Sequence, residues 1–77
     1  MWKANKAMEE IFQEIKLRKY IDGLVLIARI GVHAEILNHH PDLYFSPSRL
    51  KITLTTKSAG GLTDLDTVMA ERIENFI

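Results

Sequence analysis

The sequence predicts an α+β fold, a two-layer sandwich with an antiparallel sheet and both helices packed on one of its faces. Apolar and polar residues alternate over residues 50–56, which is the two-residue period of a half-buried strand. Residues 19–38 and 63–76 instead carry apolar residues at the spacing of an α-helix. With two strands expected before the first helix and two more between the helices, the element order is β-β-α-β-β-α.

The first two strands are expected at the start of the chain. Residues 10–18 have their apolar side chains on one side of an extended segment, Ile11, Ile15 and Leu17, with Gln13 interrupting that side. Two of these isoleucines are also four residues apart, so a helical fragment remains an alternative. Residues 2–8 are expected as a short partner strand, with the turn near residues 8–10.

The helix predicted over residues 19–38 has two apolar stripes on nearly opposite sides. One stripe is Ile21, Leu24, Val25, Ala28, Val32 and Ile36, and the other is Leu26, Ile30, His33 and Leu37. A helix in a two-layer monomer needs only one apolar face, so the second predicts contact with another subunit. The Leu26/Ile30/Leu37 stripe is the predicted partner surface. The alternative is that the other helix of the same chain covers the second stripe.

The second half of the chain predicts a hairpin and a final helix. Pro41 is expected to end the first helix, because the residue before a proline favours extended conformations. Residues 42–46 and 50–56 are the two strands, and the second of them points Leu50, Ile52 and Leu54 to one face and Lys51, Thr53 and Thr55 to the other. Residues 58–61, "SAGG", are expected to form a loop.

The final helix is expected to begin after Thr63, which is placed as its N-cap. Asp66 lies three residues on, where a capping-box partner is expected. The predicted apolar face of this helix, interpreted as core, is Leu65, Val68, Met69, Ile73 and Phe76.

The amino-acid composition limits which classes of function are possible. The 77 residues predict a single domain, 1–77, with a small core, and oligomerisation is the expected source of additional buried area. Cysteine is absent, which excludes disulfides, thiolate chemistry and Cys-ligated metal sites. Ten basic and ten acidic residues balance, which argues against direct nucleic-acid binding. No apolar run is long enough for a membrane span or a signal peptide, so a cytoplasmic location is expected.

Two adjacent histidines, His39 and His40, stand out in "EILNHHPDLY". As metal ligands they are weak, because neighbouring side chains diverge and zinc takes three or four protein ligands. Glu35 and His39 have the four-residue spacing of a helical metal-binding pair, but His33 lies on the opposite stripe from Glu35. Metal binding is therefore a poor interpretation of these histidines.

Acid/base chemistry is the better interpretation of these histidines. Imidazole titrates near pH 6.5, so it can both give and take a proton at neutral pH. A helix C-terminus favours the imidazolium, and Glu35, one turn earlier, can orient either ring. The alternative is a solvated helix stop, since His near a helix C-terminus followed by Pro is an ordinary terminator.

A family resemblance favours the chemical interpretation. Residues 34–66 contain an E-x-x-x-H-H-P pattern, Glu35, His39, His40 and Pro41, then a threonine-rich strand, then the "GGLTxxD" element, Gly60, Gly61, Leu62, Thr63 and Asp66. This combination resembles the pterin-4a-carbinolamine dehydratases, also called DCoH, and the resemblance extends over the whole chain, with Trp2 and Phe12 at the family's spacing.

The resemblance implies a DCoH-like β-β-α-β-β-α fold and dehydration of 4a-hydroxytetrahydropterin to quinonoid dihydropterin. It implies no metal or cofactor, a pterin substrate such as tetrahydrobiopterin's carbinolamine, and a homodimer or homotetramer. It also implies His39 as the acid/base residue, with His40 polarising the pterin and Glu35 tuning both. The implied substrate-binding residues are Pro41, Lys57, Ser58 and Asp66, although Asp66 is more readily interpreted as a helix cap.

One position departs from the family pattern. A third histidine normally follows the threonine-rich strand, and this chain has Lys57 after Thr56. A protonated lysine donates hydrogen bonds but has no acceptor. Reduced turnover, a different pterin and loss of catalysis are all compatible with Lys57, which without the resemblance would be a solvated strand-end lysine. The alternative functions are a catalytically impaired oligomeric binding module and a transcriptional coactivator.

Overall fold

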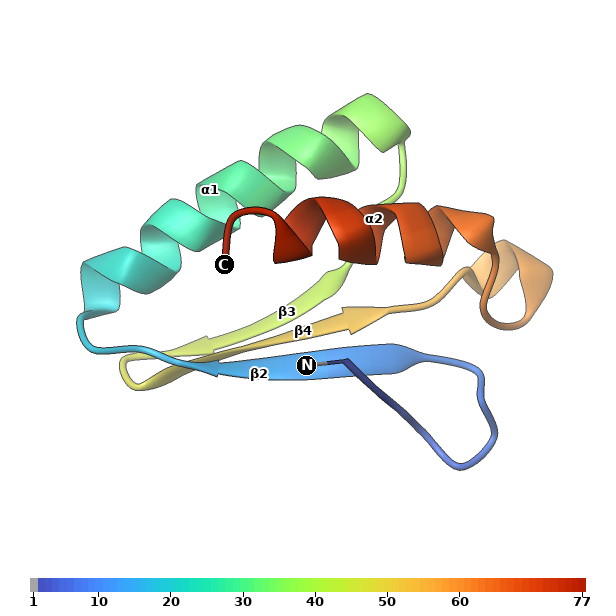
Figure 1. The fold of residues 1–77 in the computed structure, drawn as a ribbon, viewed down its shortest axis with the longest axis horizontal. Helices are drawn as coiled ribbons and strands as arrows, with labels where there is room; N and C mark the ends of the chain where they lie inside the picture. The colour runs from blue at the N-terminus through green and yellow to red at the C-terminus, as the bar shows by residue number, and fades with distance from the viewer. Residues whose placement is uncertain (1) are drawn as a thin grey trace.

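The computed structural model describes residues 2–77, and it has the predicted α+β architecture. The elements in order are β1 (Lys3–Ala4), β2 (Ile11–Lys16), α1 (Tyr20–Leu37), β3 (Asp42–Ser46), β4 (Arg49–Leu54), the 3-10 turn η1 (Lys57–Ala59) and α2 (Asp64–Glu74). The strands form one layer, and both helices lie over the same face of it (Figure 1). The segment 10–18 is a strand rather than a helical fragment.

The sheet is antiparallel throughout, in the order β1-β2-β4-β3. β4 is central, pairing with β2 on one side and β3 on the other, so its ends are held on both sides. Asp42, the first residue of β3, pairs with Thr53 near the end of β4. This pairing brings the segment after α1 beside the segment after β4, and the candidate site forms between them.

The core lies between the sheet and the helices, as strand alternation predicts. The buried apolar residues are Ile30, Ala34, Leu50, Ile52, Leu54, Met69, Ala70 and Ile73. Gln13, the polar interruption noted in β2, is buried as well. Leu65 and Val68 of α2, expected in the core, remain 41% and 39% exposed, because α2 turns that side away from α1 and the sheet.

The face of α1 that packs inward is the opposite of the one predicted. Ile30 is fully buried, and Leu26 and Leu37 pack against the core, so the Leu26/Ile30/Leu37 stripe is not a partner surface. A Cβ at Gly23 would collide with the Phe45 ring, so this glycine permits the close approach of α1 to β3. The exposed apolar face is Ile21, Leu24, Val25, Val32 and Ile36.

α1 ends at Leu37, four residues before Pro41, so the proline is not what breaks the helix. Asn38 adopts the left-handed conformation, at φ 50° and ψ 44°, which asparagine tolerates better than most residues. The backbone N–H of His39 then donates to the carbonyl of Ala34 at 3.0 Å, which closes the helix end. His39 and His40 consequently lie in the connection to β3, outside the helix.

Candidate active site

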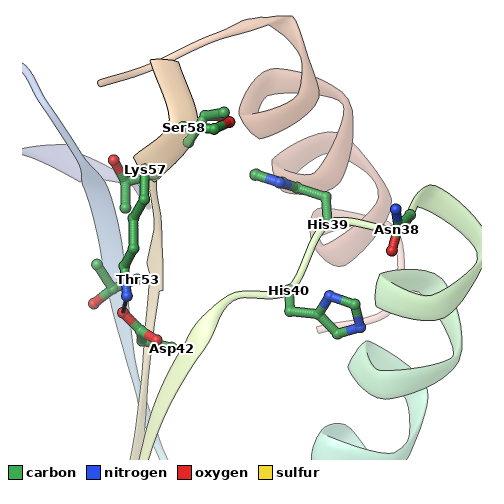
Figure 2. A pocket seen from close by; sticks show the side chains of 9 residues that line it. Asn38, His39, His40, Asp42, Thr53, Lys57 and Ser58 are labelled. Atoms are coloured by element: carbon green, nitrogen blue, oxygen red, sulfur yellow. Dashed lines mark ion pairs between the residues drawn. The ribbon is translucent and has the colours of Figure 1, made fainter. Parts of the chain in front are cut away.

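A cavity of about 250 Å³ opens where the α1–β3 connection meets the end of β4 and η1. This volume is at the small end of ligand pockets and suits a compact bicyclic ring. All of its lining residues carry polar side chains: Asn38, His39, His40, Asp42, Thr53, Thr55, Thr56, Lys57 and Ser58 (Figure 2).

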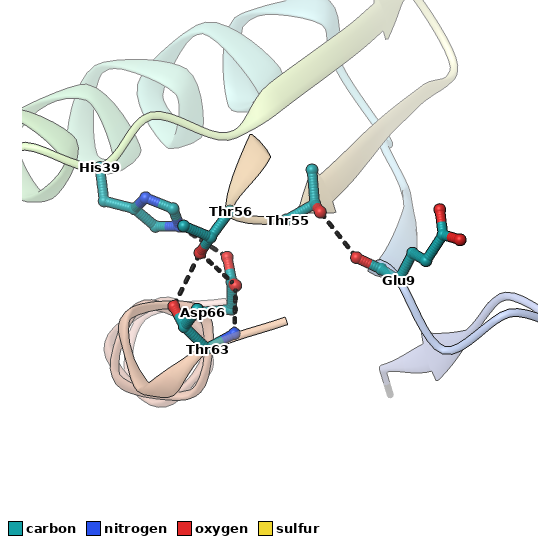
Figure 3. Close-up of polar contacts among 6 residues, drawn as sticks. All are labelled: Glu9, His39, Thr55, Thr56, Thr63 and Asp66. Atoms are coloured by element: carbon teal, nitrogen blue, oxygen red, sulfur yellow. Dashed lines mark hydrogen bonds and ion pairs between the residues drawn. The ribbon is translucent and has the colours of Figure 1, made fainter. Parts of the chain in front are cut away.

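His39 is held at this cavity by a buried carboxylate. Its Nε2 lies 2.6 Å from Oδ1 of Asp66, near the N-terminus of α2 (Figure 3). The His39 side chain is 10% exposed and that of Asp66 is 1% exposed. A short contact between two groups so withdrawn from water is a strong, orienting hydrogen bond.

Asp66 is itself fixed by two further donors on its other oxygen. The hydroxyl of Thr56 donates to Oδ2 at 2.7 Å, and the backbone N–H of Thr63 donates to it at 3.0 Å. The second bond is the N-cap contact predicted for Asp66. The hydroxyls of Thr56 and Thr63 also lie 2.7 Å apart, so the network joins the end of β4 to α2.

These contacts hold Asp66 ionised. Burial by itself would raise the pKa of Asp66, but the hydrogen bonds from His39, Thr56 and Thr63, with the nearby imidazole charge, lower that pKa below its ordinary value. An ionised Asp66 accepts from His39, so Nε2 of His39 carries a proton. Because Nε2 orients the ring, the other ring nitrogen, Nδ1, is not needed for this purpose.

His40 occupies a different environment from its neighbour. Its Nε2 lies 3.6 Å from Oε1 of Glu35, and the side chains are 56% and 79% exposed. In Figure 2 the His40 ring turns toward α1, whereas the His39 ring extends toward the segment that carries Lys57 and Ser58. An exposed ion pair of this kind contributes little energy, so Glu35 positions His40 only loosely.

Lys57 faces the cavity from the start of η1. Its Nζ lies 3.8 Å from Oδ2 of Asp42, with side-chain exposures of 80% and 56%. Figure 2 shows both side chains on one side of the cavity, opposite His39 and His40. Ser58, the next residue, also lines the cavity. Asp42 begins β3 and Lys57 begins η1, three residues after β4 ends, and the register of β3 and β4 brings these two segments close together.

The structure therefore gathers most, but not all, of the predicted site residues. His39, His40, Lys57 and Ser58 line the cavity. Asp66 lies behind His39, fully buried, and Glu35 reaches the site only through His40. Pro41 is half-buried and does not line the cavity.

Sequence reasoning missed five lining residues, Asn38, Asp42, Thr53, Thr55 and Thr56. Asp42 follows the His-His-Pro run by one residue, and Asn38 precedes it, so adjacency to the histidines was an available signal. The role of Thr56 had no such signal, because it depends on contact with Asp66.

The third histidine, His33, lies away from the cavity. Its ring stacks on Phe76 with centroids 5.3 Å apart, and its Nδ1 lies 3.3 Å from Nη1 of Arg72. Within residues 2–77, no three His, Cys, Asp or Glu side chains converge as a metal site would require. Among the same residues, no helix is long and apolar enough to cross a membrane.

Comparison with known proteins gives matches over nearly the whole chain. The family model described as "Pterin 4 alpha carbinolamine dehydratase" matches residues 1–76. The chain belongs to this family. A similar dehydratase-family protein from Rhizobium leguminosarum bv. trifolii (strain WSM2304), named "Putative pterin-4-alpha-carbinolamine dehydratase", is 36% identical over 95% of this chain and 72% of its own length.

Solved structures extend the similarity to the dehydratase fold. A protein from Brucella melitensis, described as a "transcriptional coactivator/pterin dehydratase", superimposes with a TM-score of 0.90 at 30% identity, over 96% of this chain and 79% of that one. A pterin dehydratase-like protein described as a RuBisCO assembly factor of the alpha-carboxysome has a TM-score of 0.79 at 16% identity, over 96% of this chain and 86% of that one. The second likeness concerns the fold alone.

Proposed function

We propose that this chain dehydrates 4a-hydroxytetrahydropterin to quinonoid dihydropterin, with His39 as its acid/base residue. The observation that carries the proposal is the buried contact between His39 and Asp66 at 2.6 Å, made at the wall of a cavity that also contains His40 and Lys57. Family membership supports this reaction, and the buried contact supports His39 as the proton-transfer group.

The reaction requires two proton movements. The bond from C4a to its hydroxyl oxygen breaks, and that hydroxyl needs a proton to leave as water. The electron pair of a ring N–H bond forms the new ring double bond, so that proton must be accepted. A single positioned imidazole can serve either step, and each such transfer contributes roughly 10²–10⁴-fold to the rate.

Asp66 fits the role of a positioning residue for His39. Its carboxylate accepts from Nε2, which orients the ring and leaves Nδ1 to exchange a proton with a ligand in the cavity. A buried carboxylate also stabilises the imidazolium that forms when His39 takes up a proton. His40, more exposed and held by Glu35, is assigned to binding and polarising the pterin, with Ser58 at the opposite wall.

The test is a stopped-flow measurement of quinonoid dihydropterin formation from the 4a-hydroxy substrate. His39→Ala is expected to lower kcat by about 10²-fold or more, because the proton-transfer group is removed. His33→Ala is the matched control, since this histidine lies outside the cavity and its loss should leave the rate unchanged. A wild-type rate no faster than the uncatalysed reaction would overturn the proposal, as would full activity in His39→Ala.

We further propose that the chain assembles as a homodimer or homotetramer through α1. The supporting observation is the exposed apolar face of this helix, where Ile21, Val32 and Ile36 are 56%, 59% and 65% exposed. A contiguous apolar surface of this kind is typical of a protein–protein contact. This face, and not the buried stripe, would also be the surface of the alternative binding-module function.

A further inference from the structure

We propose that Asp42 and Lys57 together recognise the pyrimidinone edge of the pterin ring, which makes Asp42 a specificity-determining residue. This inference rests on the proposed function, because it concerns which part of the same substrate meets which wall of the cavity. It begins from the Asp42–Lys57 contact at one side of the cavity and from the chemistry of that ring edge.

Three carboxylates surround the site, and only Asp42 is placed to meet a ligand. Asp66 is fully buried and already accepts from His39, Thr56 and Thr63. Glu35 is 79% exposed at its side chain and lies outside the cavity lining. Asp42 lines the cavity, and its carboxylate is 56% exposed.

The contact that Asp42 makes is easily replaced. A distance of 3.8 Å between two largely exposed groups is a loose ion pair, and such pairs contribute about 0–1 kcal/mol. A ligand that offers each partner a better hydrogen bond would therefore displace it at little cost. The backbone of Asp42 is by contrast fixed, because it pairs with Thr53 in the hairpin.

The two side chains match the pyrimidinone edge in hydrogen-bonding character. That edge presents two donors, the ring N3–H and the 2-amino group, beside one acceptor, the O4 carbonyl oxygen. A carboxylate is an acceptor only, and an ammonium is a donor only. Asp42 would accept from N3–H and the 2-amino group, and Lys57 would donate to O4.

This orientation also gives Lys57 a place near the reaction. O4 is attached to the carbon next to C4a, which carries the departing hydroxyl. An ammonium bound at O4 therefore lies on the side of the ring where negative charge develops as the hydroxyl leaves. The position that departs from the family's histidine would thus combine recognition with electrostatic stabilisation.

The inference is tested by comparing two inert probes, 6-methyl-7,8-dihydropterin and the corresponding dihydrolumazine, which has an oxygen in place of the 2-amino group. Calorimetry should show that the wild-type protein prefers the pterin by about 10-fold or more, because the lumazine oxygen faces the Asp42 carboxylate. Asp42→Asn should abolish this preference, since an amide can donate to that oxygen. Lys57→Met should weaken both probes about equally, because both carry O4.

The matched control is Glu14→Gln, which neutralises the other exposed carboxylate in a strand ion pair, 3.6 Å from Arg49 and away from the cavity. It should keep the full preference for the pterin. An unchanged preference in Asp42→Asn would overturn the inference while leaving the proposed function standing. If the wild-type protein bound neither probe, the pterin assignment itself would fall, and this inference with it.

Discussion

Lys57 occupies the position at which the resemblance to the dehydratase family implies a third histidine. Its ammonium lies at the cavity next to the carboxylate of Asp42, where it can donate hydrogen bonds but cannot accept a proton while charged. Under the proposed function, His39 transfers the proton, and His40 is the second imidazole that lines the cavity. A charged lysine in place of an imidazole is therefore expected to limit the rate of the reaction.

Replacing Lys57 by histidine tests that limit. Lys57→His should raise kcat by about 10-fold or more, because an imidazole at this position can both give and take a proton near neutral pH. The same substitution should weaken binding of an inert pterin, because a permanently charged donor to O4 is lost. Stopped-flow turnover and calorimetry measure the two effects separately. A fall in both kcat and affinity would show that Lys57 is the better catalytic group here.

At the scale of secondary structure, the two sides of α1 have different roles. Its inner side, with Gly23 against Phe45 and Ile30 in the core, fixes the helix on the sheet. Its C-terminal end, through the left-handed Asn38, directs His39 toward α2. Its outer side is apolar and exposed, and it is the side that we assign to assembly.

Two substitutions, two residues apart on α1, distinguish the role of the outer side in assembly from the role of the inner side in the core. Val32→Glu should dissociate the oligomer while leaving the free energy of unfolding of the protomer nearly unchanged, because Val32 is 59% exposed. Ile30→Glu should instead unfold much of the protein, since it buries an unpaired charge at a site with no exposure. Light scattering after size exclusion and circular dichroism measure the two outcomes.

The control for assembly is Met8→Glu, which places a charge at another exposed apolar residue, 64% exposed and distant in sequence from α1. It should leave the oligomeric state unchanged. A wild-type protein that is monomeric at all concentrations, or an oligomer that survives Val32→Glu, would contradict assembly through this face.

At the scale of the whole molecule, Asp66 connects three separate segments. Through His39, Thr56 and Thr63 it links the α1–β3 connection, the end of β4 and the start of α2. A chain of 77 residues has a small core, so one buried network of this kind is a sizeable part of its stability. The same carboxylate therefore serves both the fold and the site.

This arrangement predicts a specific loss of stability in acid. The pKa of Asp66 is lower in the folded protein than its ordinary value of 3.8, so its stabilisation is fully present above that value and is lost as the pH falls through the folded pKa. Asp66→Asn should cost about 2 kcal/mol at pH 7 and should flatten this acid dependence. Urea unfolding between pH 2.5 and 7 measures both, with Asp64→Asn as an exposed control on the same helix. An equal acid dependence in wild type and Asp66→Asn would contradict the assignment.

The sequence by itself determined the elements, their order and the site's motif residues. Strand alternation in residues 50–56 and helical spacing in residues 19–38 are recorded in neighbouring residues, so local patterns suffice to find them. The His-His-Pro run and the capping position of Asp66 could be predicted from the sequence for the same reason. The end of α1 was predicted to within one residue, but its cause was not, because the left-handed Asn38 ends the helix before Pro41 is reached.

Only the tertiary structure decided how these parts meet. Both stripes of α1 are apolar, so periodicity could not say which one is buried; packing of Gly23 against Phe45 decides it. Asp66 meets His39 across 27 positions of the chain, and Asp42 meets Lys57 through the register of β3 and β4. Contacts between distant residues follow from how whole elements pack, and no local pattern records them.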